Sequence, residues 1–156
     1  MQKAAYSFDE FDFGTKLIQD LVNQKDAVKT FVTDFYQPQN VGKIIKSKSF
    51  TSKQRELLVL VLNEQNKDLD LSVKSKSNID SLNQNNVFTI TTGHQLNLLT
   101  GPLFSIYKIA QIISISEGLN KQYPQQKFVP VFWMASEDHD FEEINHLHLF
   151  GKKISW

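Results

Sequence analysis

Cysteine is absent from this sequence, and arginine is nearly so, because Arg55 is the only arginine among 17 basic residues. Without cysteine, the 156 residues cannot contain disulfides, thiolate metal sites or a cysteine nucleophile. Tight recognition of phosphates and carboxylates usually recruits the bidentate guanidinium group. An anion bound by this chain must therefore be held by backbone N–H groups, lysine or histidine, unless sequence outside the chain supplies arginines.

An excess of charge of one sign is also missing, as are long apolar runs. Basic and acidic residues both number 17, so the net charge is zero and no long-range field attracts the protein to nucleic acid or to a membrane surface. No apolar run approaches the roughly 20 residues needed to span a bilayer, and the polar first ten residues do not resemble a signal peptide. We therefore expect a cytoplasmic protein without nucleic-acid or membrane partners.

The first part of the chain, residues 1–86, has the pattern of a helical and irregular region that packs on the core that follows. Apolar residues recur at helical spacing between Leu17 and Phe35, with an interruption near residues 23–26. Pro38 is expected to close this stretch.

A further helix is predicted to begin at Thr51, because Gln54 stands three residues later and completes a capping-box spacing. Lysine, serine and asparagine are frequent in residues 43–49 and 63–86, and we expect loops in both ranges. A short helix from Ser77 is the one exception that we expect within them.

The second part, residues 87–156, predicts the first portion of an α/β fold with a parallel sheet. Residues 87–91 form a short β-branched and aromatic run, and residues 128–134 are apolar without alternation, as in a strand buried on both faces. A helix is expected between them over residues 102–119, with a proline in its first turn. Pro130 indicates a bulge, a missing ladder bond or a position near the sheet edge.

The predicted helix is apolar nearly all round, and Gly118 and Pro124 are expected to end it. Beyond the second strand, residues 146–150 and 154–156 predict a third strand turning into a fourth. The chain stops within that fourth strand, so we expect it to stop before the core is complete. The main buried face of the helix is predicted to consist of Leu103, Ile106, Tyr107, Ala110 and Ile113.

Two loops leave the carboxyl ends of the predicted strands, where ligands bind in parallel α/β sheets. They comprise residues 92–101 and 135–143, and they face each other across one crevice if the two strands are neighbours. In the first loop, Gly93 lets the backbone approach a ligand closely, and the following helix offers free N–H groups and about half a positive charge. His94 adds a donor. The loop therefore predicts an anion site, and the alternative is a turn that its histidine and glutamine only hold in place.

The second loop places five carboxylates around His139. A histidine between Asp138 and Asp140 has a fixed tautomer and suits general acid–base catalysis. Glu142 and Glu143 have a simpler explanation, because carboxylates in the first turn of a helix complement its dipole.

A metal site is an alternative for the same region. His139, Glu143 and His146 are spaced i, i+4 and i+7 and would share one face of a helix if the helix continued that far. This arrangement would suit a metal-dependent hydrolase. His148 alternates with leucines, so a solvated strand face is expected for it.

Four segments of the sequence resemble a known family. They are TTGHQ at residues 91–95, LTGPL at 99–103, IYK at 106–108 and PVFWMASEDHDFEE at 130–143. These segments are similar to the amino-terminal part of the bacillithiol synthase (cysteine ligase) family, whose members are several times longer than this chain. The resemblance is strong over residues 89–150.

The resemblance implies a Rossmann-like core related to nucleotidyltransferases and, in the longer protein, a coiled coil that forms a homodimer. It implies a reaction that joins the amino group of glucosaminyl-malate to the carboxyl group of L-cysteine, with ATP or ADP as the expected cofactor. His94 then takes the place of the second histidine in the His-x-Gly-His nucleotide signature. Thr91 stands where the first histidine would be, so half of the usual phosphate clamp is absent. We expect this chain alone to be inactive.

These expectations define two sets of site residues and no metal ligand. The alternative function is a non-catalytic binding or assembly fragment, in which residues 15–66 supply a helical docking surface. The catalytic set is His94, Asp138, His139 and Asp140. The substrate-binding set is Thr92, Gly93, Gln95, Asn97, Trp133, Ser136 and Glu137.

Overall fold

A computed structural model shows how the chain folds. The chain divides into two compact units, Met1–Lys48 and Ser49–Trp156. The structure describes residues 10, 14–32, 35, 37–97, 99, 101, 103–138 and 140–155, and for Glu143 it describes the backbone only.

The first unit consists of short helices. They are α1 (Lys16–Val22), the 3-10 helices η2 (Asp26–Val28) and η3 (Pro38–Asn40), and α2 (Val41–Lys46). The hydroxyl of Thr15 caps α1 by accepting a hydrogen bond from the backbone of its third residue. The interruption predicted after α1 is confirmed.

Three expectations for this unit are wrong. Pro38 begins η3 rather than closing the preceding stretch, because its fixed φ angle suits the first turn of a helix. Residues 43–49 were expected to be a loop, yet α2 continues to Lys46. The side chain of Phe31, expected on a helical face, is 81% exposed and lies outside the helices.

The second unit begins with α3 (Ser52–Gln65), and the predicted capping box is confirmed at its start. The amide N–H of Gln54 donates to the hydroxyl of Thr51 over 3.3 Å, and the Gln54 side-chain oxygen accepts from the Thr51 backbone over 2.8 Å. The loop expected over residues 63–86 is wrong in part, because α4 (Val73–Ser81) starts four residues before the predicted position.

Next come β1 (Val87–His94), α5 (Leu103–Gln122) and β2 (Lys127–Met134), in the predicted order. The two strands are parallel and pair along their whole length, so the predicted strand–helix–strand unit is confirmed. β1 runs three residues further than expected, which places Thr92, Gly93 and His94 in the strand. In the sheet that the described residues form, β2 pairs only with β1, so Pro130 lies on an edge strand.

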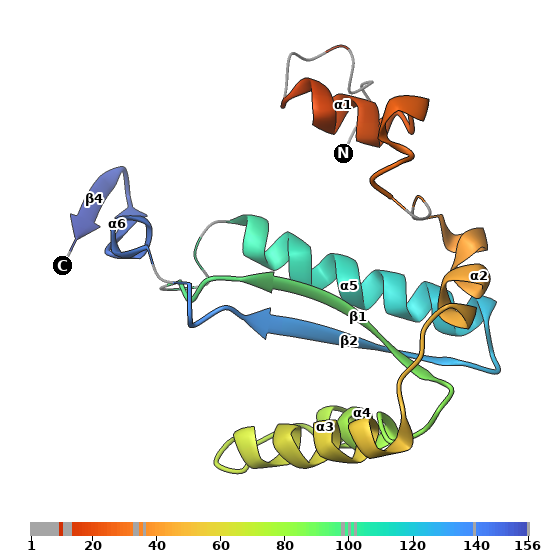
Figure 1. The fold of residues 1–156 in the computed structure, drawn as a ribbon. Helices are drawn as coiled ribbons and strands as arrows, with labels where there is room; N and C mark the ends of the chain where they lie inside the picture. Colours follow the sequence, from red (N-terminus) through yellow and green to blue (C-terminus); the bar gives the residue numbers. More distant parts are fainter. Residues whose placement is uncertain are drawn as a thin grey trace. The chain divides into compact units, whose positions relative to one another are not determined.

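Helices cover both faces of this sheet, as Figure 1 shows, with α5 on one face and α3 and α4 on the other. Burial of apolar side chains between the layers drives their packing. On the α3 and α4 side, the buried core consists of Leu82, Val87 and Val129, with Leu58, Val59, Leu62 and Val131 packed against it.

The buried face of α5 differs from the predicted one. Its predicted residues are exposed, with Leu103 at 64% and Tyr107 at 65%. Because α5 is apolar nearly all round, periodicity could not identify the face on the sheet, and two small serines let the helix approach closely. The buried residues of α5 are Ser105, Ile112, Ser116 and Leu119.

The predicted end of α5 is wrong in part, because Gly118 lies within the helix, which continues to Gln122 and ends just before Pro124. The space where a Cβ of Gly118 would stand is open, so the glycine causes no break. Asn120 instead fixes the end of the helix to the start of β2. Its side chain donates to the backbone oxygen of Phe128 over 3.0 Å and accepts from the Phe128 N–H over 2.8 Å.

Arg55, the single arginine, is buried and has a structural role. Its Nη1 donates to the carbonyl oxygens of Leu82 (2.9 Å) and Val87 (3.1 Å), and its Nη2 donates to that of Asn85 (3.4 Å). The guanidinium also stacks on the ring of Phe50, 5.6 Å from its centroid. Arg55 therefore connects α3 to the end of α4 and the start of β1 through its two terminal nitrogens, while its buried Nε has no hydrogen-bond partner among the described residues.

The chain continues with α6 (Phe141–Ile144), β3 (His146–Leu149) and β4 (Lys152–Ser155). The predicted third and fourth strands are confirmed, but they pair antiparallel in a sheet of their own. Phe150 and Gly151 join them with positive φ angles of 48° and 75°, as a tight hairpin turn requires.

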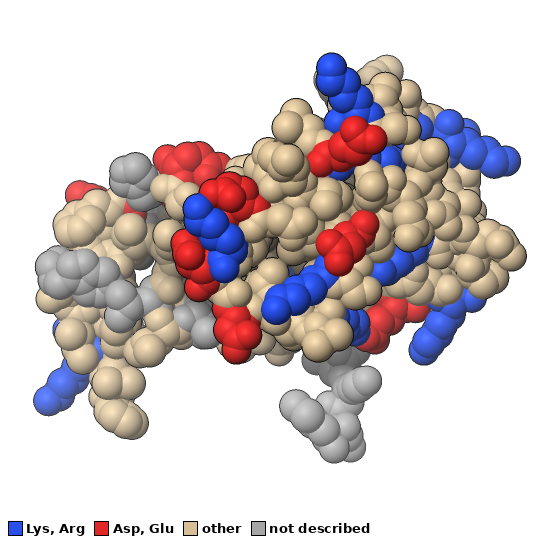
Figure 2. All heavy atoms as spheres, turned by 90° about the horizontal axis from the view of Figure 1, so that it is seen from below, with Lys and Arg blue, Asp and Glu red and all other residues tan. Residues whose placement is uncertain are grey.

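Lysine and arginine residues and aspartate and glutamate residues both occur on the surface that Figure 2 shows, in agreement with the net charge of zero. Among the described residues, no helix is long and apolar enough to cross a membrane.

Candidate functional site

The two strand-end loops begin side by side at one edge of the sheet. The register pairs Gly93 with Trp133 and His94 with Met134, the last residues of the two strands. Just beyond, the N–H of Ala135 donates to the carbonyl oxygen of His94 over 3.1 Å. The structure therefore brings together the regions on which the sequence placed the candidate site.

Gly93 permits a close approach to its backbone, but the group that lies close to it is Trp133 rather than a ligand. A Cβ added to Gly93 would lie 3.1 Å from the carbonyl oxygen of Trp133 and 3.2 Å from its Cβ. The indole of Trp133 is 57% exposed, and its N–H donates to a carboxylate oxygen of Glu137 over 3.2 Å. Gly93 thus lets the indole lie across the strand ends, where it can form one wall of a binding surface.

His94 is held by the loop that follows it. Its Nδ1 lies 2.9 Å from the side-chain nitrogen of Asn97, which also donates to the carbonyl oxygen of Gln95 over 3.0 Å. The same Nδ1 lies 3.1 Å from the carbonyl oxygen of Gln95. It accepts from the Asn97 amide in one tautomer and donates to the Gln95 carbonyl oxygen in the other. In both cases the loop orients the ring through Nδ1, and Nε2 is the nitrogen that faces a ligand.

Gly101 fixes the position of Asn97. It has a φ angle of +59°, and a Cβ at this residue would lie only 2.4 Å from the Cβ of Asn97. No other residue fits there without displacing the loop, because the left-handed backbone and the lack of space both favour glycine. The orientation of His94 therefore depends on a glycine seven residues away.

Lys108 is a candidate that the sequence argument did not select. From the second turn of α5, its ammonium group donates to the carbonyl oxygen of Gly93 over 3.0 Å and lies 4.3 Å from the centroid of the Phe104 ring. The ring of Phe104 also contacts His94 edge-on, with centroids 6.1 Å apart. The available signal was the spacing of four between Phe104 and Lys108, which places both on one side of the helix.

The second loop is more exposed. Ser136, Glu137 and Asp138 are all exposed, and a tight turn holds them, with the N–H of Asp138 donating to the carbonyl oxygen of Ala135 over 3.3 Å. Asp140 caps α6, since its Oδ1 accepts from the N–H of Glu142 over 2.9 Å. Capping gives Asp140 a structural explanation, whereas the carboxylate of Asp138 faces solvent.

Two of the predicted site residues, His139 and Thr92, are not among the described residues of the loops. His139, assigned to the catalytic set, lies outside the described residues. Thr92 is half-buried within β1, so it lines the strand end rather than the loop.

The helical arrangement behind the metal alternative is wrong. α6 ends at Ile144, and His146 begins β3, so the i, i+4, i+7 spacing does not form one helical face. The Nδ1 of His146 contacts the side-chain oxygen of Asn145 over 3.0 Å. No group of three or more potential ligands that could hold a metal ion occurs in the part of the chain that the structure describes. His148 is exposed, as predicted.

Comparison with known proteins identifies the family to which the chain is similar. A family model described as "Bacillithiol biosynthesis BshC, N-terminal Rossmann-like domain" matches residues 1–156. Among curated proteins, those of Christiangramia forsetii and Flavobacterium johnsoniae are each 45% identical over 152 residues, which is 96% of this chain. The protein of Staphylococcus carnosus is 32% identical over 137 residues. All three carry the name "Putative cysteine ligase BshC".

The chain covers only a part of these relatives. It spans 28% of the length of the Christiangramia forsetii protein, 29% of the Flavobacterium johnsoniae protein and 25% of the Staphylococcus carnosus protein. The family match covers the whole chain and confirms the predicted Rossmann-like α/β fold. The chain therefore belongs to the BshC family and corresponds to its N-terminal Rossmann-like domain.

Proposed function

We propose that this chain contributes the strand-end binding surface of a ligase that joins the carboxyl group of L-cysteine to the amino group of glucosaminyl-malate, the last step in forming bacillithiol. The observation that carries the proposal is the pairing of β1 and β2 up to His94 and Met134, which starts both loops at one edge. The cysteine-ligase name of the relatives supports the reaction class. Because the chain spans less than a third of those relatives, the remaining sequence is expected to complete the site, and the chain alone is expected to be inactive.

The first loop binds an anionic group in this proposal. The Nε2 of His94, which carries a proton in this proposal, and the ammonium of Lys108 supply donors near the end of β1, and the N-terminal turn of α5 adds a partial positive charge. Such charge-assisted hydrogen bonds are stronger than neutral ones. The anion is a malate carboxylate of glucosaminyl-malate or a phosphate group. Gln95, Asn97 and Trp133 line the remainder of the surface.

The fit to ATP is only partial. Thr91 is exposed on β1 at the place of the first signature histidine, so the described residues supply half of the expected clamp. ATP would activate the cysteine carboxyl group if it bound, and no residue is assigned to that step. The assigned step is the attack itself: the amine nitrogen would form a bond to the carboxyl carbon of the activated cysteine, the C–O bond to the activating group would break, and that group would leave with the bonding electron pair. Asp138 accepts the proton that the amine loses, because its carboxylate is exposed beside the strand ends.

Product formation by the full-length protein tests these roles. Replacing Asp138 with alanine is expected to lower kcat/KM by about 100-fold or more, the usual effect of removing a general base. Replacing His94 with alanine removes a charge-assisted hydrogen bond to the anion and is expected to lower kcat/KM by about tenfold or more. His148→Ala is the matched control, since this histidine is exposed on β3, and it is expected to leave the rate unchanged. Wild-type rates in both alanine variants would show that the assignment is wrong.

A binding or assembly role is the second candidate. The observation in its favour is that α3 exposes large apolar side chains, with Leu57 at 61% and Leu60 at 65%. If α3 served only for docking, Leu57→Ser with Leu60→Ser would abolish an oligomer in light scattering, while product formation would be absent even in the full-length wild type.

A further inference from the structure

A pocket lies at the end of the sheet opposite the strand-end loops. It has a volume of about 480 Å³, and α4, the turn after it and the first residue of β2 line it. Lys127 in this pocket is the first residue of β2, and Met134 is the last. At roughly 3.3 Å per residue, the two ends of the strand are about 23 Å apart, so this pocket is separate from the surface formed by the strand-end loops.

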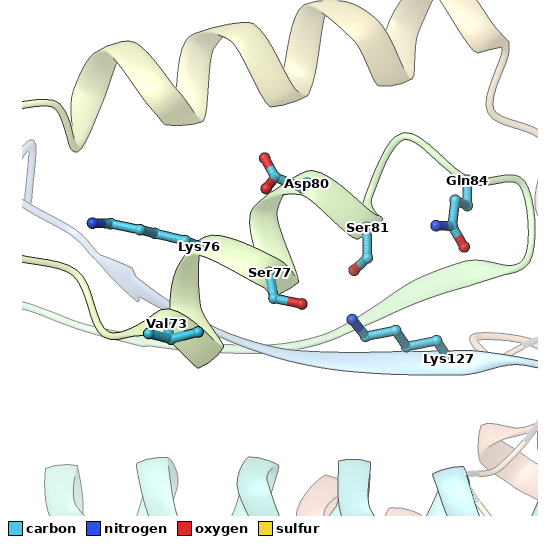
Figure 3. Close-up of a pocket in the computed structure, with 7 residues that line it drawn as sticks. All are labelled: Val73, Lys76, Ser77, Asp80, Ser81, Gln84 and Lys127. Atoms are coloured by element: carbon cyan, nitrogen blue, oxygen red, sulfur yellow. The ribbon is translucent and has the colours of Figure 1, made fainter.

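Three polar side chains meet in this pocket. Figure 3 shows the hydroxyls of Ser77 and Ser81 turned toward the ammonium group of Lys127, while Asp80 points away from them. The side chain of Gln84 lines the adjoining part of the pocket. Ser77, Ser81 and Gln84 follow one another at helical spacing, so a single face of α4 and its continuation presents them.

The positive charge of Lys127 is not neutralised by an ion pair within the part of the chain that the structure describes. Lys127 is half-buried. The carbonyl groups at the end of α4 already have donors. The hydroxyl of Ser81 donates to Asn78 over 2.8 Å, and the N–H of Gln84 donates to Ser81 over 3.0 Å.

Arg55 also offsets the negative end of the α4 dipole. Its guanidinium donates to the carbonyl oxygen of Leu82 just beyond the last turn of the helix. The pocket therefore presents the ammonium group of Lys127 together with hydroxyl and amide groups, while the side chains of Lys76 and Asp80, which also line it, point away from them (Figure 3).

We propose that this pocket binds the phosphate group of a small phosphorylated molecule. A phosphate can accept hydrogen bonds from Lys127, Ser77 and Gln84 at once, because several of its oxygens are free to accept. Volumes of about 300–1,000 Å³ are usual for small-molecule sites, so space remains for an organic group. Val73, which is 86% exposed, and the aliphatic stem of Lys76 give that part of the pocket apolar surface.

The test is a titration of the 15N-labelled protein with inorganic phosphate and, separately, with glycerol 1-phosphate, followed by amide chemical shifts. Shifts are expected at Ser77, Ser81 and Lys127, with tighter binding of glycerol 1-phosphate than of inorganic phosphate. Lys127→Gln is expected to weaken binding about tenfold or more. Ser77→Asp, at an exposed helix position where folding is safe, is expected to abolish it by repulsion.

Lys74→Gln is the matched control. Lys74 lies on the same helix, with its ammonium group 4.0 Å from Glu117, and it does not line the pocket. This variant removes the same charge and is expected to keep the affinity within about twofold, as surface charges away from a bound ion contribute little.

Three results would overturn the proposal. Equal affinity in the wild type and in both Lys127→Gln and Ser77→Asp would exclude the pocket as the binding site. Shifts confined to residues 92–97 would place the phosphate at the other end of the sheet. Equal affinity for inorganic phosphate and glycerol 1-phosphate would show that the pocket does not recognise an organic group attached to the phosphate. Because none of these residues belongs to the proposed ligase site, product formation is expected to continue in all three variants.

Discussion

The two loops that leave one edge of the sheet are held in different ways. At the end of β1 and the start of the loop after it, residues 92–95 are half-buried, Asn97 bonds to both His94 and Gln95, and Gly101 leaves room for this arrangement. In the loop after β2, residues 136–138 are exposed and are held by turn hydrogen bonds. The first loop is ready to bind before a ligand arrives, whereas the second must be ordered by the ligand or by the rest of the protein, at a cost in affinity.

Because the two loops are held differently, we expect each to have a different function. Recognition of a fixed anionic group suits the first loop, because its donors already have fixed directions. Transfer of a proton suits the second, where an exposed carboxylate can approach a substrate from solvent. Substitutions in the first loop should therefore change stability and affinity together, and those in the second should change the rate with little effect on stability.

The largest effect is expected for Gly101→Ala. The positive φ angle alone costs an alanine about 1–2 kcal/mol, and the overlap with Asn97 adds to this cost. The free energy of unfolding should fall by at least that amount, and the amide signals of residues 94–97 should shift. Urea unfolding and an amide spectrum measure both effects.

Gly118→Ala is the control for that substitution. Gly118 lies within α5 where a Cβ meets open space, so alanine should stabilise the protein by about 0.5–1 kcal/mol through the helix backbone. If the two variants had the same stability, the loop after β1 would not be held as the structure shows.

The second prediction concerns Lys108→Met, which keeps the aliphatic stem and removes the ammonium group. Loss of a charge-assisted hydrogen bond and of the positive charge should raise the KM for glucosaminyl-malate about tenfold. Lys121→Met, in the exposed last turn of α5, should leave KM unchanged. An unchanged KM in Lys108→Met would mean that the anion is bound by other groups.

The sequence predicted the order of the elements at this edge because strand and helix patterns are local. Residues 87–91 and 128–134 were apolar and β-branched in short runs, and two parallel neighbours necessarily bring their carboxyl ends together. The capping box at Thr51 was equally local, since Thr51 and Gln54 satisfy each other's backbone groups. These features depend on few distant contacts.

Features that depend on tertiary approach were missed. The serines that face the sheet from α5 were passed over in favour of larger apolar residues, because a helix that is apolar all round has no distinctive period. The contact of Lys108 with the carbonyl oxygen of Gly93 depends on the distance between α5 and β1. The spacing of residues in the sequence does not determine that distance. The start of α4 was missed because its lysines and serines resemble a loop, although the Ser72 hydroxyl caps it by accepting from the N–H of Ser75 over 3.1 Å.

The third prediction separates the two explanations of Asp140. Asp140→Ser keeps a side-chain acceptor for the N–H of Glu142, and Asp140→Ala removes it, at a typical cost of about 1 kcal/mol for a helix cap. If Asp140 is a cap, the serine variant keeps the ligase rate and the alanine variant exchanges the amides of α6 faster. If both variants lose activity alike while the serine variant keeps the slow amide exchange, Asp140 takes part in catalysis.

The smallest effect is expected for Glu137→Ala in the exposed loop. The substitution removes the carboxylate that accepts from the indole N–H of Trp133, and exposed contacts of this kind usually contribute less than about 0.5 kcal/mol. The indole proton of Trp133 should exchange faster in an NMR spectrum, while the free energy of unfolding should remain the same. Glu137→Gln retains an acceptor oxygen and should behave like the wild type. A more than tenfold rise of KM in the alanine variant would show instead that Glu137 contacts substrate, and that the second loop also takes part in recognition.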